Sequence, residues 1–547
     1  MLAATLAVVM FILPLFVPFP LLDPDEGLHA AIAQEMVASG SWTTPRFLGQ
    51  PFLDKPILYF WGQAASLSAF GSSEWAVRLP GLLFGFLGMV TTGLLAGRLI
   101  ERRVGWIAAI FYATTILPTA LAQVPAHDVA LIPWVNLSIL LLWESHYAAS
   151  PVRLLAGILG AGVFLGLSIL TKGMLGVAAV GLAFGLYLLL ARQVNRRAFL
   201  IAPAVLLIAV AIGAPWYCAV EAQNPGFLSY YFLDRHVGGL ATDNQPHSNQ
   251  PWWYYLPILL GGGLPWVGYL PVLVRDARDK RRTIDGVSLS TSDDGHPQPR
   301  RAPLLLLWAW FLGWTLFVTL AQSKLVTYLW PALPPMAMLA AVAWNRYLNA
   351  SFSPAASRGL ARSFVSSSLS GPIVLPAVGL VLQSLYDVRF DTVTWLAIGL
   401  VAVASPLPLL PWRKGRPQAA LAVAGLSVAA QFLVAIALVL PSLADRFSAR
   451  DLADYFNHRQ QFPSRLLLAD ARVGGSLVFY LDPPLRSGLQ PEQLVRLLPD
   501  RPAELLPGDV VALPEHRVYR LEKYPFLKDR PYQTINGYRL YQIGAAR

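Results

Sequence analysis

Long apolar stretches recur along the whole chain, and they constrain its fold more than any other feature. A helix needs roughly 20 apolar residues to cross the hydrocarbon core of a bilayer, which is about 30 Å thick. Stretches of about this kind occupy residues 2–20, 76–97, 104–122, 129–143, 154–171, 174–191, 199–218, 252–274, 304–322, 325–345, 371–386, 392–411 and 418–441. The sequence therefore predicts a polytopic α-helical membrane protein with about 13 transmembrane helices.

The composition excludes two common classes of protein. Of 547 residues, 55% are hydrophobic and only 13% are charged, which is too apolar for a soluble enzyme. The net charge of +11 would otherwise suggest nucleic-acid binding, but the basic residues gather in the loops between apolar stretches. The single cysteine, Cys218, lies in an apolar stretch, so we expect neither an intramolecular disulfide nor a cysteine metal cluster.

The distribution of lysine and arginine predicts the orientation of the helices. One alternating set of loops holds about 20 basic residues, and the opposite set of short loops holds about six. The positive-inside rule makes the basic set cytoplasmic, which places the N-terminus inside and, with an odd number of spans, the C-terminus outside. The first stretch follows no basic segment and precedes no A-x-A cleavage site, so we interpret it as a spanning helix and not as a signal peptide.

The composition changes after residue 441, which predicts two domains. Residues 1–441 form the transmembrane domain, and residues 442–547 alternate helix-like and strand-like segments typical of a soluble α/β domain of roughly 100 residues. We expect this second domain on the outer side. A polar segment at 279–303 is interpreted as a flexible cytoplasmic loop.

The first outward loop, residues 21–75, carries an unusual pair of carboxylates. An Asp-Pro pair and a later Gly40 predict the start and the end of an amphipathic helix along the membrane surface. Asp25 and Glu26 fall in its first turn, where carboxylates either complement the helix dipole or serve a site. These two residues alone do not decide between the alternatives.

The same loop ends in Asp54-Lys55-Pro56, where the proline marks the start of another helix. A cation at a helix N-terminus is electrostatically unfavourable unless an anion joins it. Lys55 is therefore either a ligand for an anion or a solvated lysine beside the lipid headgroups.

Three further outward loops carry polar residues beside the membrane. His127 and Asp128 lie between the third and fourth spans, where Asp128 is either a helix cap or a site residue. The loop at 219–251 is polar and aromatic, and a tight turn follows the ninth span. The polar residues of these last two loops are Arg235, His236, Asp243, His247, Lys324 and Tyr328. The run WWYY at 252–255 is interpreted as an interfacial aromatic belt.

The predicted topology brings these polar residues to one membrane face. Carboxylates and cations beneath an outer domain suit a site that binds an anionic lipid and transfers a proton. The residues concerned are Asp25, Glu26, Asp54, Lys55, Asp128, His236, Lys324 and Tyr328. A transporter would instead place ionisable residues near the bilayer midplane and show repeats between its halves.

The segments LDPDEGLHAAIAQEM and PFLDKP resemble the bacterial aminoarabinose transferases of lipid A. These are polyprenyl-phosphate-dependent GT-C glycosyltransferases, which include the protein O-mannosyltransferases. The family pattern of an acidic pair and a later acidic-Lys-Pro matches Asp25-Glu26 and Asp54-Lys55-Pro56 here. Further matches are Asp128, His236, GLPW at 263–266 and SKLVTYLWP at 323–331. The resemblance covers residues 20 to about 335, and it implies a GT-C fold with a C-terminal periplasmic α/β domain.

This resemblance implies an integral membrane glycosyltransferase of the bacterial inner membrane. The donor would be a sugar on undecaprenyl phosphate, and the acceptor lipid A or another envelope glycolipid at the periplasmic face. A protein O-glycosyltransferase with the same donor class is the alternative, and a lipid or solute transporter or a non-catalytic assembly partner are alternatives of other classes. No cofactor is required, although a divalent cation stays open because suitable ligand types are present in Glu26, Asp54 and His236.

The resemblance also implies a role for each polar residue. The catalytic carboxylates, which would orient the sugar or acceptor or act as a base, are Asp25, Asp128 and Glu26. The donor phosphate would be bound by Lys55, Tyr328, Lys324, His29 and Arg235. The remaining substrate contacts would come from Asp54, His236 and Phe52. The chain departs from its relatives at Leu28-His29, where they often have Arg-Tyr, and after His236, where they have arginine.

Overall fold

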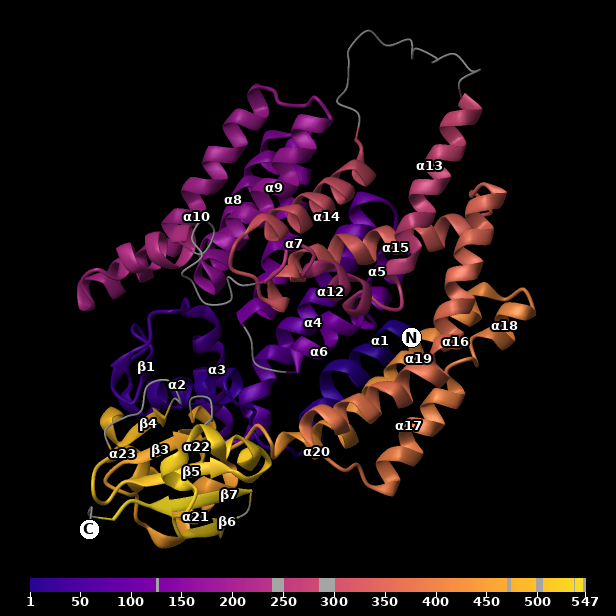
Figure 1. Ribbon diagram of the computed structural model, residues 1–547. Helices are drawn as coiled ribbons and strands as arrows, with labels where there is room; N and C mark the ends of the chain where they lie inside the picture. The colour runs from indigo at the N-terminus through magenta and orange to yellow at the C-terminus, as the bar shows by residue number, and fades with distance from the viewer. Residues whose placement is uncertain are drawn as a thin grey trace.

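The chain folds into a large helical domain with a smaller C-terminal domain at one end (Figure 1). The computed structural model describes residues 1–123, 127–238, 250–284, 301–469, 474–497, 505–535 and 537–544. Asp243, His247 and most of the 279–303 segment lie outside the described residues.

Within the described residues, nine helices are long and apolar enough to cross a membrane. They are α4 (Glu74–Leu99), α7 (His127–His146), α8 (Pro151–Lys172), α10 (Arg196–Gln223), α14 (Pro303–Leu320), η5 with α15 (Val326–Leu348), α16 (Pro354–Tyr386), α17 with α18 (Thr392–Arg413) and α19 to α20 (Pro417–Ala444). The number rises to 11 when each of two bent pairs is one span. These pairs are α5 (Arg102–Ala113) with α6 (Ile116–Ala122), and α12 (Tyr255–Gly262) with η4 (Val267–Tyr269) and α13 (Leu270–Ile284).

The expected number of 13 helices is therefore higher than the 9 to 11 candidate spans of the described chain. The other two apolar stretches form shorter helices, Leu2–Phe16 and α9 (Met174–Leu190). At 1.5 Å per residue they are roughly 22 and 26 Å long, less than the thickness of a typical hydrocarbon core. The first stretch is interrupted because proline limits a helix, and it divides into α1 (Leu2–Ala7), η1 (Val8–Ile12) and η2 (Leu13–Phe16).

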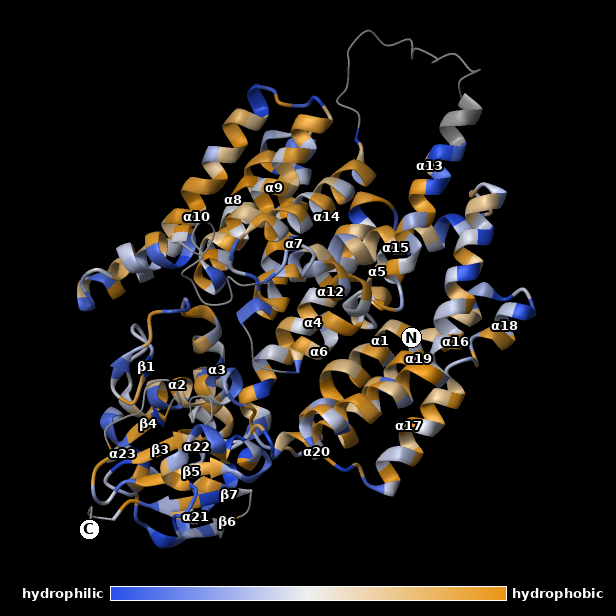
Figure 2. Ribbon diagram, viewed as in Figure 1, coloured by the Kyte–Doolittle hydropathy of each residue, from blue (hydrophilic) through white to orange (hydrophobic). Residues whose placement is uncertain are grey.

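The outer helices expose large apolar side chains, as expected for a surface that faces lipid. Leu200 and Leu207 on α10 and Leu400 on α17 are each 71% exposed. Figure 2 shows apolar residues over most of this outer helical surface. By contrast, α15 (Leu333–Leu348) is buried along most of its length and packs against α5, α13 and α14. The helical domain therefore has an interior core as well as a lipid-facing surface.

The C-terminal domain is built on a five-stranded mixed sheet in the order β4-β3-β5-β7-β6. Strand β3 is parallel to β4 and β5, whereas β7 is antiparallel to β5 and β6. Strand β3, between β4 and β5, is an apolar run that is buried throughout, as is usual for a parallel strand covered on both faces. The elements are α21 (Arg450–Arg459), β3 (Leu466–Ala469), α22 (Gly475–Tyr480), α23 (Pro483–Ser487), η7 (Pro491–Gln493), β4 (Leu494–Leu497), β5 (Val510–Pro514), η8 (Glu515–Lys523), η9 (Pro525–Leu527), β6 (Tyr532–Ile535) and β7 (Tyr538–Gln542).

The first loop of the helical domain packs against the C-terminal domain. It contains α2 (Asp25–Ser39), a hairpin of β1 (Arg46–Phe47) and β2 (Gln50–Pro51), and α3 (Leu58–Phe70). Helix α2 packs against both α22 and α3, so most of its residues are buried on more than one face. In Figure 1 the C-terminal domain and α2 lie at the bottom, and the start of α10 and the end of α13 lie at the top.

Candidate active site

A cavity of about 900 Å³ opens between the first loop and the adjacent ends of several membrane helices. One group of lining residues is polar and comes from α2, α7, α8, η3 (Ser229–Val237) and the segment between β2 and α3. These polar residues are Asp25, His29, Asp54, Lys55, Asp128, Lys172, Arg235 and His236. A second group of lining residues is apolar and comes from α9 and α14, through Met174, Leu175, Ala178, Trp314, Phe317 and Val318. The cavity can therefore hold a molecule with a charged head and an apolar tail.

Lys55 is an unpaired cation in this cavity. Within the described part of the chain it makes no hydrogen bond or ion pair, although Asp54 and Asp128 lie close enough to influence its charge. Removal from water, together with the neighbouring cation of Lys172, lowers the pKa of Lys55 from 10.5 to about 8. The residue is therefore still mostly charged at neutral pH and is ready to pair with an anion.

A buried salt bridge joins Asp128, in the first turn of α7, to Lys172, the last residue of α8. Their side chains are 9% and 8% exposed. Lys172 also lies over the ring of Tyr328, with 5.7 Å between its Nζ atom and the ring centroid. Lys172 is not among the site residues predicted from the sequence. The available signal was a lone lysine at the end of a long apolar helix.

Gly173 allows the third outward loop to approach Lys172. It has a φ of +62°, and a Cβ atom there would lie 2.7 Å from the Tyr231 hydroxyl and 2.9 Å from His236 Nε2. Only glycine combines this backbone conformation with such close contacts. The segment η3 therefore packs directly against the end of α8.

The segment η3 contributes a second pair of charges and a histidine. Arg235 binds Asp54 at 2.9 Å, and the Tyr230 hydroxyl donates a hydrogen bond to the same carboxylate. The Nδ1 atom of His236 lies 2.7 Å from the carbonyl oxygen of Tyr231. Removal from water lowers the pKa of His236. Because a carbonyl oxygen can only accept, Nδ1 is the donor in the contact with Tyr231.

Aromatic rings surround two further histidines of the cavity lining. The centroid of the His127 ring lies 4.8 Å from that of His29 and 4.7 Å from that of Phe60. The His29 ring also contacts Phe52, with 6.5 Å between centroids. Within the described residues, neither imidazole nitrogen of His127 has a hydrogen-bond partner.

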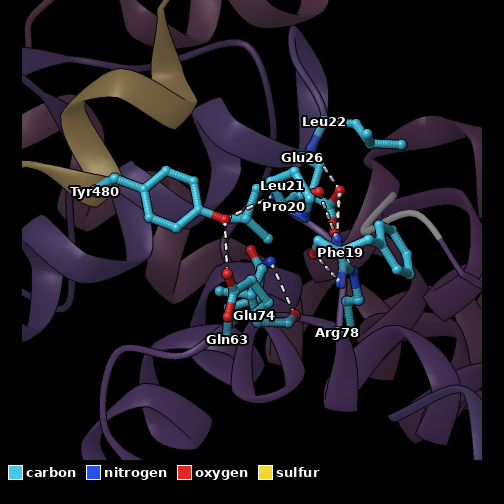
Figure 3. A network of polar contacts seen from close by, with 10 residues as sticks. Phe19, Pro20, Leu21, Leu22, Glu26, Gln63, Glu74, Arg78 and Tyr480 are labelled. Carbon is cyan, nitrogen blue, oxygen red and sulfur yellow. Dashed lines mark hydrogen bonds and ion pairs between the residues drawn. The ribbon is translucent and has the colours of Figure 1, made fainter. Parts of the chain in front are cut away.

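Two of the residues predicted for the site lie outside the cavity lining. Glu26 is buried and binds Arg78 through two contacts of 2.7 and 3.2 Å (Figure 3). Lys324 is also buried, and its Nζ atom donates a hydrogen bond of 2.6 Å to the carbonyl oxygen of Ala321. Glu26 follows Asp25 by about 100° around the helix, so the two side chains leave it in different directions. The structure therefore does not bring Glu26 or Lys324 to the cavity lining, and their roles in the reaction stay predictions.

The other nine predicted site residues line the same cavity. They are Asp25, His29, Phe52, Asp54, Lys55, Asp128, Arg235, His236 and Tyr328. The three residues suggested as metal ligands, Glu26, Asp54 and His236, do not come together, because Glu26 is bound to Arg78. Among the described residues, no group of three His, Cys, Asp or Glu side chains has the spacing to hold a metal ion.

Comparison with known proteins agrees with the resemblance found in the sequence. The family model described as dolichyl-phosphate-mannose-protein mannosyltransferase matches residues 54–218. The chain is 31% identical over 317 residues to an undecaprenyl phosphate-α-4-amino-4-deoxy-L-arabinose arabinosyl transferase of Pseudomonas fluorescens, covering 58% of this chain and 54% of the relative. The corresponding transferase of Edwardsiella ictaluri is 33% identical over 341 residues, covering 62% of this chain and 58% of the relative. The matched region thus spans little more than half of these curated relatives.

The fold is that of ArnT. The crystal structure of ArnT from Cupriavidus metallidurans bound to undecaprenyl phosphate superposes with a TM-score of 0.75 at 21% identity. The match covers 100% of this chain and 98% of that chain. The predicted similarity to aminoarabinose transferases is therefore confirmed in both sequence and fold.

Proposed function

We propose that this protein is a membrane glycosyltransferase that moves 4-amino-4-deoxy-L-arabinose from undecaprenyl phosphate to lipid A. The cavity with its two groups of lining residues carries this proposal. Its apolar group, on α9 and α14, suits a polyprenyl chain, and its polar group includes Lys55, Lys172 and Arg235 for a phosphate. The similarity to arabinosyl transferases favours this donor and acceptor among those with the same chemistry.

The reaction needs stabilisation of a leaving phosphate. When the acceptor oxygen attacks the anomeric carbon, the bond to the donor phosphate breaks and negative charge grows on undecaprenyl phosphate. Lys55, which makes no ion pair within the described residues, stabilises this charge, and the Tyr328 hydroxyl lines the same cavity. Lys172 lines the same cavity, but its ammonium group is already paired with the Asp128 carboxylate.

The carboxylate of Asp25 is assigned to the sugar and acceptor side. It lines the cavity from the first residue of α2. There it can stabilise positive charge that develops at the anomeric carbon, or take the proton of an attacking hydroxyl. A phosphate acceptor is already a nucleophile and needs little base, whereas a hydroxyl acceptor makes Asp25 indispensable.

The positions of the basic loops support an orientation with the cavity on the periplasmic side of the inner membrane. The start of α10 and the end of α13 are rich in arginine and lie away from the C-terminal domain (Figure 1). Single cysteines at Lys414 and Asp454, in a Cys218→Ser background, test this arrangement. We expect a membrane-impermeant thiol reagent to label position 454 in intact spheroplasts and position 414 only after lysis; the reverse pattern would refute the orientation.

A reconstituted assay tests the activity. The purified chain in lipid vesicles is given the undecaprenyl-phosphate-linked sugar and lipid A, and products are identified by mass spectrometry. We expect sugar-modified lipid A from the wild type and from the surface controls Lys414→Ala and Asp454→Asn, and little from Lys55→Ala or Asp25→Asn. Absence of product with the wild type would reject this donor and acceptor, and a modified envelope protein would establish protein O-glycosylation instead.

A further inference from the structure

We propose that helix α22 of the C-terminal domain positions the Asp25 carboxylate in the cavity by holding the first turn of α2. The inference rests on the proposed function, because that function assigns the chemistry to Asp25. Asp25 is exposed and makes no hydrogen bond within the described chain, so no side-chain contact there holds it and the backbone of α2 decides where it enters the cavity. Ser476 and Asp23 are then positioning residues, since they act on the cavity through this backbone.

The two helices meet backbone to backbone through a pair of glycines. A Cβ atom on Gly27 would lie 2.3 Å from the Ser476 amide nitrogen. A Cβ atom on Gly475 would lie 2.2 Å from the Leu28 amide nitrogen. Real Cβ atoms do not come this close to other atoms, so each helix needs glycine at the contact. The contact falls two residues after Asp25, within the same helical turn.

Residues of the C-terminal domain also make hydrogen bonds with Asp23 at this contact. The Ser476 amide donates a hydrogen bond of 3.0 Å to Asp23 Oδ1, and its hydroxyl donates one of 2.6 Å to Asp23 Oδ2. The Ala449 amide donates to the same hydroxyl at 2.8 Å, and the Asp23 amide donates to the Phe447 carbonyl at 2.7 Å. Both the side chain and the main chain of Asp23 are thus fixed two residues before Asp25.

A third contact fixes the segment that enters α2. The Leu21 amide donates a hydrogen bond of 2.8 Å to the Tyr480 hydroxyl, which donates one of 3.0 Å to Glu74 Oε1 (Figure 3). Tyr480 is the last residue of α22, and Glu74 is the first of α4. Helix α22 therefore ties the entry of α2 to a membrane helix, while α2 delivers Asp25 and His29 to the cavity.

Small displacements at a reacting centre have large kinetic effects, which is why the contact between α2 and α22 matters for the reaction. A shift of about 1 Å in a catalytic group can lower a rate by about 100-fold. The three cations that the proposed function assigns to the donor phosphate, Lys55, Lys172 and Arg235, lie outside α2. Loosening the contact should therefore slow the chemical step and leave donor binding nearly unchanged.

The test compares Ser476→Ala with Asp23→Asn and with the matched control Ser464→Ala in the full-length, reconstituted protein. Ser464 is an exposed serine of the same domain whose one hydrogen bond among the described residues goes to the Gly508 carbonyl, at 3.5 Å. We expect Ser476→Ala to lower kcat by about tenfold or more while the KM for the donor stays within twofold. Asn at position 23 keeps both oxygen and nitrogen in hydrogen-bond reach of Ser476, so Asp23→Asn should retain at least a third of the wild-type kcat. Ser464→Ala should match the wild type.

Hydrogen exchange supplies a readout that does not depend on activity. Peptides covering residues 25–39 should exchange faster in Ser476→Ala than in the wild type or Ser464→Ala. If Ser476→Ala does not fold, Ser476→Cys serves in its place, because sulfur fills the same volume and is only a weak hydrogen-bond partner. A kcat within twofold of wild type, a matching loss of donor affinity, or unchanged exchange in α2 would overturn the inference. A wild type without transferase activity would instead reject the proposed function, and the exchange result would still decide the positioning role.

Discussion

Two adjacent carboxylates, Asp25 and Glu26, show how one helical turn serves two different regions of the molecule. Glu26 is fully satisfied: it receives two contacts from Arg78 and a hydrogen bond of 2.7 Å from the Leu22 amide. Arg78 is satisfied as well, through the carbonyl oxygens of Phe19 and Pro20 and the ring of Phe19. Asp25 faces the cavity with no such partner in the described chain. Saturation of hydrogen-bonding capacity therefore distinguishes the structural carboxylate from the one left for a ligand.

The largest effect is expected for Lys55, which like Asp25 lines the cavity and makes no hydrogen bond within the described residues. Lys55→Ala should lower kcat/KM by on the order of 10²- to 10³-fold, because a charge that stabilises the leaving phosphate is lost. The thermal midpoint should hardly change, since no partner is left unpaired. Steady-state kinetics and thermal unfolding in detergent check both statements, with Lys414→Ala as the control. A large fall in thermal midpoint with normal kinetics would place Lys55 among the structural charges.

For Glu26, whose oxygens are all hydrogen-bonded, we expect the opposite pattern: a loss of stability with little loss of activity. Glu26→Gln should destabilise the protein by about 3–5 kcal/mol, because it leaves the guanidinium of Arg78 buried without its counter-ion. Activity per folded molecule should stay close to wild type. The double change Glu26→Met/Arg78→Met should recover much of the stability, because it removes both buried charges together. A Glu26→Gln protein that is stable but inactive would show that Glu26 takes part in the reaction.

The comparison also explains which parts of the site could be predicted from the sequence. Local motifs predicted Asp25, Lys55 and Asp128, since each lies at the start of a helix beside an apolar stretch. The partner of Glu26 could not be predicted, because Arg78 is 52 residues away and lies inside an expected membrane span. Lys324 is not in the cavity lining for a related reason: neighbouring positions in a turn point in different directions, and only the fold decides which one faces the cavity.

The fold shows the same division between local and distant information. Apolar length predicted the membrane helices, but hydropathy alone does not show where a helix begins and ends, and two of the 13 expected spans form helices of fewer than 18 residues. The contact between Gly27 and Gly475 joins segments almost 450 residues apart, and nothing in either local sequence predicts it. Contacts between distant glycines depend on how the domains dock, which local patterns do not encode.

A moderate effect is expected from pH, again through Lys55. Its pKa in the folded protein is lowered to about 8, so the charged form that binds phosphate is present below pH 8 and is lost as the pH rises above it. We expect kcat/KM to fall on the alkaline side with an apparent pKa near 8, by about tenfold per pH unit once well above it. Lys55→Arg should move this fall to higher pH, because guanidinium stays protonated. An alkaline limb that is identical in Lys55→Arg would assign it to another group.

The smallest effect is expected for the pair of Arg235 and Asp54. This pair is more exposed than the buried pair of Glu26 and Arg78, but unlike Lys55 its residues have an ion-pair partner. Their side chains are 29% and 34% exposed, so water screens the attraction and the pair should contribute less than about 1 kcal/mol to stability. The pair can still sharpen the comparison, because Arg235 is either satisfied by Asp54 or available to the donor phosphate. If it is available, Arg235→Ala should raise the KM for the donor by about two- to fivefold, and Asp54→Asn should lower or preserve it by releasing the guanidinium. If both substitutions raise KM equally, the pair only holds η3 in place, and Arg235 is a structural charge like Glu26.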